Sequence, residues 1–186
     1  MILLEDQVKR AFDGKNYNFD EIFEFTKEYI SGADFSIGVF EGPLGGTARL
    51  YSQSNYGDGK SLYINFPDEF VDALKKAGFN LVTTANNHIL DMGVDGAHRT
   101  VDILKEKNID FIGSYRNAED KANSRVKVVE KDGIRMVFLA YTYGANRFKT
   151  EQLMSEKLSH LTSLIVRREN PVFETVLAEV KKDFEL

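Results

Sequence analysis

The polar cluster Asn86-Asn87-His88, with Asp91 three residues further on, carries the side chains best suited to chemistry in this chain. The cluster follows an apolar run over 79–84 and precedes a helical pattern that begins near Val94. Open α/β sheets bind ligands beyond the carboxyl ends of their strands, in loops that concentrate functional residues. An imidazole binds metals or transfers protons near neutral pH, and amide oxygens bind hard cations. On residue chemistry alone, a functional site and a capped strand-to-helix turn are equally favoured.

Two further segments place polar side chains after apolar runs. Glu41 follows the run 34–40, where a carboxylate would bind a hard cation, act as a general base, or simply face solvent. Tyr143 and Asn146 follow the run 134–141, where a pocket wall is expected. Their simpler interpretations are a core aromatic and a turn residue, because Asn tolerates left-handed turn geometry.

The remaining histidines give a weaker signal. His98 falls inside a helical pattern, and His160 lies in the carboxyl-terminal region. A single histidine in a helix is more often a partly buried or surface residue than a ligand. We therefore give neither position much weight as a candidate site.

Composition excludes several classes of function. The chain has 186 residues, of which 42% are hydrophobic and 28% charged, as in ordinary globular domains. A net charge of −5 and a pI of about 5.3 leave no basic footprint for nucleic acid. Cysteine is absent, which excludes disulfides, thiolate metal sites and a cysteine nucleophile. No run reaches the roughly 18 apolar residues of a membrane span, so we expect a soluble chain as given.

Hydrophobic periodicity and turn residues predict an α/β order of elements with a mixed sheet. The loop-like segment 42–60 is rich in Gly, Ser, Asn and Tyr. Lys131-Asp132-Gly133 indicates a hairpin turn. The predicted helices are 19–30, 66–77 and 94–107, and the predicted strands are 34–40, 79–84, 109–113, 125–130 and 134–141.

The region after Lys149 has a different pattern. Residues 151–168 and 172–184 both have helical periodicity, and Asn170-Pro171 separates them. We expect an α/β core over 1–148 and a helical carboxyl-terminal segment over 149–186 that packs on it.

Three segments, in order, resemble the CapA-type capsule-synthesis family, which is named for poly-γ-glutamate capsule production and is similar to the calcineurin-like metallophosphoesterases. The segments are 32–44, 64–93 and 138–146, so the resemblance covers roughly 19–148. Ordered agreement of this kind is more specific than any single motif. It implies part of a layered, metallophosphoesterase-like α/β fold.

The resemblance also implies roles for individual residues. Asn87 would be a metal ligand, and His88 an acid or hydrogen-bond donor at a phosphoryl-like transition state. Apart from the resemblance, Asp91 would either orient His88, as carboxylates commonly do, or cap the helix that follows. Glu41 would be a second metal ligand, although Val39 replaces the Asn of the family's Asn-x-Glu motif. The metal would be Mn, Zn or Fe. Substrate contacts are then expected from Asn86, Tyr143 and Asn146.

The ligand set that the resemblance implies is incomplete in this chain. The family's first-strand aspartate and its later Gly-His-x-His segment have no counterpart, so we expect either a chain truncated at both ends or a degenerate member. Missing edges of the sheet would leave exposed strands that pair with another chain, as in a homo-oligomer.

The expected role is in capsule or poly-γ-glutamate biosynthesis, at the cell envelope in the full-length protein. A metal-dependent hydrolase of an anionic envelope polymer comes first. The alternative is a non-enzymatic scaffold or polymer-binding component of a membrane complex for polymer synthesis or export. A metallophosphatase of small phosphoesters comes third.

Overall fold

The computed structural model describes residues 1–185. Five strands and eight helical segments follow one another along these residues. The strands are β1 (Ile37–Val39), β2 (Leu81–Thr83), β3 (Asp110–Ile112), β4 (Lys127–Lys131) and β5 (Ile134–Phe138). The helices are α1 (Glu5–Ala11), the 3-10 helix η1 (Asp20–Phe23), α2 (Lys27–Gly32), α3 (Glu69–Ala77), α4 (Gly93–Glu106), α5 (Ala118–Ser124), α6 (Thr150–Leu153) and α7 (Phe173–Asp183).

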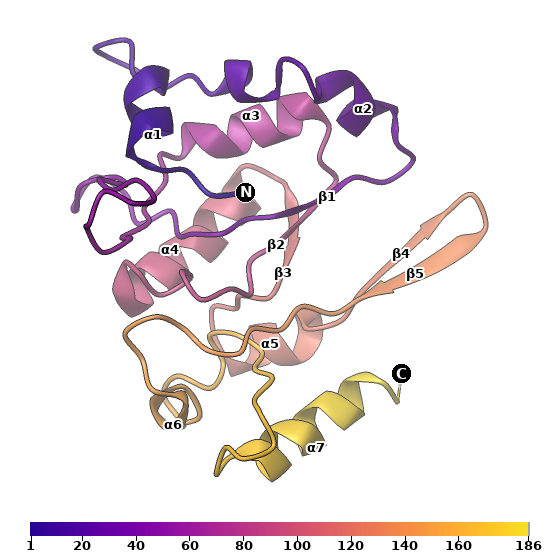
Figure 1. Ribbon diagram of the computed structural model, residues 1–186. Coiled ribbons are helices and arrows are strands. Elements are labelled where there is room, and N and C mark those ends of the chain that lie inside the picture. The colour runs from indigo at the N-terminus through magenta and orange to yellow at the C-terminus, as the bar shows by residue number, and fades with distance from the viewer. Residues whose placement is uncertain (186) are drawn as a thin grey trace.

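A parallel sheet of order β1-β2-β3 forms the centre of the molecule. The central β2 pairs on both sides, with Leu81 opposite Ile37 and Asp110. Helix α3 connects β1 to β2 and α4 connects β2 to β3, as parallel crossovers require. In Figure 1, α1, α2 and α3 lie together on one side of the sheet and α5, α6 and α7 on the other. The predicted α/β class is confirmed.

Helix α3 fills the larger hydrophobic core. Its buried face includes Phe70, whose ring lies 5.4 Å from that of Phe19 and 5.5 Å from that of Phe66, centroid to centroid. Gly78 ends the helix in the left-handed conformation, with φ of 101°. The prediction of this helix and its stop is confirmed, with a start at Glu69 instead of residue 66.

The predicted helix 19–30 is wrong in part, because η1 and α2 replace a continuous helix. Phe19 and Phe23 are buried, whereas Phe25 and Tyr29 are 86% and 82% exposed. Phe23 packs on Phe70 of α3, with ring centroids 6.2 Å apart. The chain follows the surface of α3, where only some of the aromatic side chains of the segment find a place to pack. The others stay exposed to solvent.

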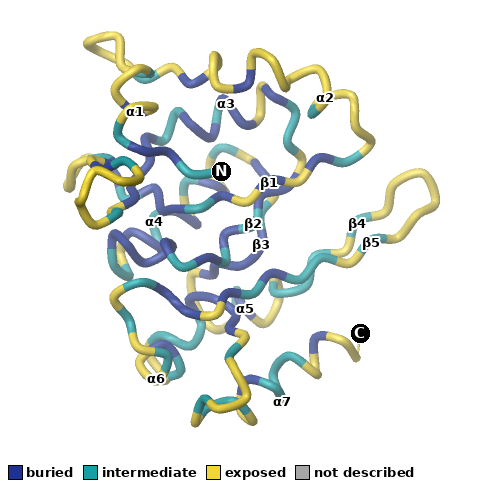
Figure 2. Tube along the Cα trace, viewed as in Figure 1, coloured by how far each residue is buried: buried dark blue, intermediate teal, exposed yellow. Residues whose placement is uncertain are grey.

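The predicted hairpin is confirmed. Strands β4 and β5 pair antiparallel, and both Asp132 and Gly133 have positive φ, as a tight hairpin turn requires. Parallel and antiparallel pairing thus occur in two separate ladders. The hairpin projects as an arm from the body of the molecule, and much of it is exposed (Figures 1 and 2).

The predicted helix 151–168 is wrong, because only α6 forms there. The backbone beyond α6 bonds to distant segments instead: Leu161 O accepts from Tyr115 N at 3.2 Å, and Ser163 O accepts from Thr142 N at 3.0 Å. These pairings need an extended backbone, so tertiary contacts override the local helical pattern. Helix α7 agrees with the predicted helix 172–184.

Within residues 1–185, no helix is long and apolar enough to cross a membrane.

Candidate functional site

The loop between β2 and α4 lies at the carboxyl end of the central strand, and Asn86 fixes its shape. The Asn86 Nδ2 donates to Phe40 O at 2.9 Å and to Thr84 O at 3.0 Å, and its Oδ1 accepts from His88 N at 2.9 Å. These bonds tie the loop to the residue that precedes Glu41. The Asn86 amide therefore has an architectural role that the sequence did not reveal, and substrate contact by Asn86 stays a prediction.

His88 and Asp91 form a buried pair within this loop. The His88 Nδ1 lies 2.7 Å from Asp91 Oδ2, and the two residues are 5% and 2% exposed. Asp91 Oδ2 also accepts from Ile64 N at 2.9 Å, which fixes the carboxylate. An ionised carboxylate only accepts, so Nδ1 carries the proton and Nε2 is left as the basic nitrogen. Nε2 is then the ring nitrogen that is able to accept a proton.

The contact between Asp91 and His88 is the one expected for an orienting carboxylate. Asp91 does not cap α4, whose N-cap is Met92 without a side-chain bond. Asp91 Oδ1 is buried and has no hydrogen-bond partner within residues 1–185. Burying a carboxylate oxygen without a partner costs folding free energy. The contact of the other oxygen with His88 and Ile64 offsets part of that cost. A catalytic role for either residue stays a prediction.

Asn146 joins the site from a distant part of the chain. Its backbone N donates to Asn87 O at 2.7 Å, and its Nδ2 lies 3.3 Å from His88 Nδ1. Because Nδ1 donates to Asp91 Oδ2, the Asn146 amide nitrogen, which is also a donor, touches Nδ1 without a hydrogen bond to it. Tyr143 is 71% exposed and lines a separate hollow of about 500 Å³ with Arg167. The structure thus brings Asn146 to His88 but not Tyr143.

The two candidate metal ligands do not form a metal centre by themselves. Glu41 lies near the amino group of Met1, whose pKa is lowered by burial and raised to a lesser extent by the Glu41 charge. Asn87 is half-buried beside His88. Across residues 1–185, no three His, Asp or Glu side chains converge to hold a metal ion. Glu41 and Asn87 therefore remain predicted ligands, and no such cluster in the described part of the chain completes a site around them.

Asn65 organises the long loop that faces the site, and the sequence reading did not single out its side chain. It is fully buried; its Oδ1 accepts from Gly45 N at 2.7 Å, and its Nδ2 donates to Gly46 O at 3.1 Å. Ile64, the residue before it, donates to Asp91. The sequence does contain a signal for this role, because Asn65 stands between the apolar residues Ile64 and Phe66. A polar side chain among buried apolar residues is normally hydrogen-bonded.

Arg147 lies on the segment that touches the pair, and other cations line a hollow beside Tyr63. The Arg147 guanidinium lies over the Tyr63 ring, with its Cζ 3.3 Å from the ring centroid. Arg147 follows Asn146, and Tyr63 precedes Ile64, so both are next in sequence to residues that touch His88 or Asp91. Tyr63 also lines a hollow of about 680 Å³ that includes Arg49 and Lys60. The sequence showed these cations only as scattered residues.

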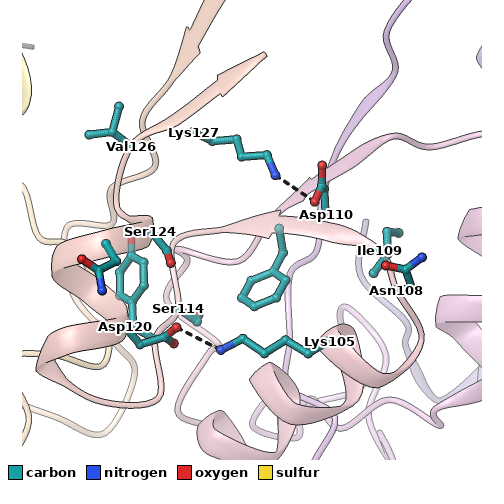
Figure 3. Close-up of a pocket in the computed structure, with 12 residues that line it drawn as sticks. Lys105, Asn108, Ile109, Asp110, Ser114, Asp120, Ser124, Val126 and Lys127 are labelled. Carbon is teal, nitrogen blue, oxygen red and sulfur yellow. Dashed lines mark hydrogen bonds and ion pairs between the residues drawn. The ribbon is translucent and has the colours of Figure 1, made fainter. Parts of the chain in front are cut away.

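Another pocket, of about 390 Å³, lies beside β3 (Figure 3). Its charged residues pair with one another: Lys105 Nζ lies 2.9 Å from Asp120 Oδ1, and Lys127 Nζ lies 2.8 Å from Asp110 Oδ1 (Figure 3). Tyr115 also lines it, and burial raises the pKa of that phenol to about 12. These charges are already neutralised, so the pocket is a weaker candidate than the loop of His88.

Comparison with known proteins gives a consistent result. Residues 2–183 match the family described as bacterial capsule synthesis protein PGA_cap. The capsule biosynthesis protein CapA of Bacillus anthracis is 32% identical over 127 residues, which are 68% of this chain and 29% of that protein. The PGA biosynthesis protein CapA of Bacillus subtilis (strain 168) is 27% identical over 123 residues, which are 66% of this chain and 31% of that protein. The matched region thus spans less than a third of either relative.

Proposed function

Because this chain belongs to the bacterial capsule synthesis family, we propose that it acts on an anionic polymer of the cell envelope, with poly-γ-glutamate as the first candidate. We further propose that His88 and Asp91 are an acid–base pair for hydrolysis of that polymer. The observation that carries the proposal is the 2.7 Å contact of His88 Nδ1 with Asp91 Oδ2 in a buried loop at the carboxyl edge of the sheet.

The chemistry follows from the tautomer that Asp91 selects. His88 Nε2 takes a proton from an attacking water molecule and returns it to the leaving group, while Asp91 stabilises the imidazolium that forms. Asn146 and Asn87 border the same imidazole and would contact the bond to be cleaved. Either an amide or a phosphoester is compatible with this arrangement.

A divalent metal enters this proposal only as a supplement. When bound, Mn²⁺, Zn²⁺ or Fe²⁺ would activate water or polarise the scissile group. Glu41 and Asn87 would then be its ligands in this chain, but they do not suffice to hold it. The proton transfers above are therefore assigned to His88 and Asp91 alone.

Binding of an anionic polymer is supported by the cations near the pair. Arg147 and Arg49 offset locally the net charge of −5 of the whole chain, whereas Lys60 is paired with Glu5 and Asp58. Arg167, beside Tyr143, would bind a more distant carboxylate of the same polymer. A polymer of this kind is located at the cell envelope, so we propose that location for the full-length protein.

The direct test is cleavage of poly-γ-glutamate of defined length by this chain, followed by the shift of polymer size in chromatography. We expect cleavage by the wild type, a loss of it in His88→Ala, and a strong reduction in Asp91→Asn, which keeps the shape but not the charge. Asn16→Ala, an exposed position outside the hollow of Arg49 and Lys60 and outside the loop of His88, is the control. Equal cleavage by wild type and His88→Ala would contradict the hydrolytic role.

A second candidate is a non-enzymatic polymer-binding component of a synthesis or export complex. It is favoured by the hollow of about 680 Å³ that Arg49 and Tyr63 line, with Arg147 over the Tyr63 ring. It predicts salt-sensitive polymer binding that Arg147→Ala weakens and His88→Ala leaves intact, without any change of polymer length.

A further inference from the structure

His98 and His160, each a weak signal in the sequence, meet in the folded chain. Their Nε2 atoms are 3.4 Å apart, the ring centroids are 5.7 Å apart, and the ring planes differ by 19°. His98 belongs to α4 and His160 to the turn that follows α6. The rings therefore face each other edge to edge across two elements that are 62 residues apart in sequence.

The separation of the two nitrogens suits a shared ion better than a direct hydrogen bond. N–H···N contacts of normal strength are near 2.9–3.0 Å, roughly the N–H···O distance, so a contact of 3.4 Å is long. Two imidazole nitrogens on one tetrahedral Zn²⁺, each about 2.0–2.1 Å from the metal, lie about 3.3–3.4 Å apart. Both side chains are half-buried, so the rings keep room to turn toward a common ion.

The surroundings of the pair define which ion it would accept. Asp95 and Asp102 flank His98 on the same face of α4, at spacings of three and four residues. Asp102 is engaged with Arg116 at 3.6 Å, and Lys121 lies near His160. Since residues 1–185 contain no cluster of three His, Asp or Glu side chains, water would fill the remaining positions. Imidazole ligands with water favour Zn²⁺, Ni²⁺ or Cu²⁺ over Mg²⁺ or Ca²⁺.

We propose that His98 and His160 form a binding site for a transition-metal dication of the Zn²⁺, Ni²⁺ or Cu²⁺ class, separate from the pair of His88 and Asp91. Such an ion would join α4 to the turn after α6. His160 precedes Leu161, which packs in one cluster with Ile89 and Leu90 of the His88 loop. The bound metal would thus clamp the carboxyl-terminal layer against the loop that carries the candidate site.

The three histidines of the chain allow a clean test, because each variant removes one of them. Zn²⁺ is titrated calorimetrically into the wild type, His98→Ala, His160→Ala and His88→Ala, and melting temperatures are measured with and without Zn²⁺. We expect saturable binding and a rise of melting temperature in the wild type and in His88→Ala, and loss of both in the other two variants. His160→Gln, which keeps the side-chain volume, serves as a second variant, and circular dichroism without metal verifies its fold.

Spectroscopy identifies the ligands independently of affinity. Bound Cu²⁺ is expected to show two nitrogen ligands in the wild type and in His88→Ala, and one at most in His98→Ala. Binding in His98→Ala and His160→Ala equal to that of the wild type would overturn the proposal, as would the absence of saturable binding in the wild type. Loss of binding in His88→Ala alone would also overturn it, and would place the metal at the other site. The outcome is independent of polymer cleavage.

Discussion

The region up to β3 and the region after it are built differently, although they meet at the candidate site. In the first, three parallel strands and the crossover helices α3 and α4 enclose a core of buried aromatic side chains. In the second, isolated bridges such as Ser114 with Thr162 replace a sheet, and the hairpin stands apart from the body (Figure 2). The first region supplies His88 and Asp91, and the second supplies Asn146. A continuous sheet thus positions the His88–Asp91 pair, and a region built from single bridges supplies the residue that reaches it.

The largest effect is expected in the first region. Phe70→Ala removes a fully buried ring that contacts other phenylalanines, so it should lower the free energy of unfolding by about 3–5 kcal/mol. Phe25→Ala, at a position 86% exposed, is the matched control and should change it by less than about 0.5 kcal/mol. Urea unfolding measures both. Similar losses of unfolding free energy in the two variants would contradict the difference between core and surface aromatic residues.

The next effect is expected where Gly113, after β3, packs against Ala85 at the start of the loop of His88. Gly113 has φ of +115°, and an added Cβ would lie 2.5 Å from the Ala85 backbone nitrogen. Gly113→Ala should therefore destabilise the chain by about 1–3 kcal/mol and displace the loop that Ala85 begins. Gly144→Ala, where nothing lies within 4 Å of the added atom and φ is not positive, is the control. Thermal unfolding of the two variants measures the difference in stability, and equal melting temperatures would show that the close contact of Gly113 with Ala85 relaxes without cost.

A loss of similar size is expected from the amide that organises the long loop. Asn65→Ala leaves Gly45 N and Gly46 O without their partner, at a cost of about 1–3 kcal/mol. Its effect should appear as faster hydrogen exchange over 42–52, with β4 and β5 unchanged. Equal acceleration in the hairpin would show that the two regions unfold together.

The smallest effect is expected at the hairpin. Val137 is 53% exposed and pairs with Val128 across the ladder, so Val137→Lys should change the free energy of unfolding by less than about 0.5 kcal/mol. Because an exposed edge invites pairing between chains, the same variant tests the predicted homo-oligomer. A shift toward monomer in sedimentation would locate the contact at the hairpin, and an unchanged state would exclude Val137 from it.

Local signals predicted the elements whose burial follows their own periodicity. The stop at Gly78 and the turn at Asp132-Gly133 need only the backbone freedom of residues adjacent in sequence, and both are where the pattern placed them. The helix predicted over 151–168 failed because Leu161 and Ser163 pair with Tyr115 and Thr142, which the local pattern cannot contain.

By itself, the sequence determined the α/β class, the loop of Asn86, Asn87 and His88, and the family resemblance of that loop, because each rests on neighbours in the chain. Only the tertiary structure decided that Asn146 reaches His88 and that Arg147 covers Tyr63. It alone decided that His98 meets His160. These contacts join residues that are distant along the chain, and single-sequence periodicity holds no information about which distant side chains pack together.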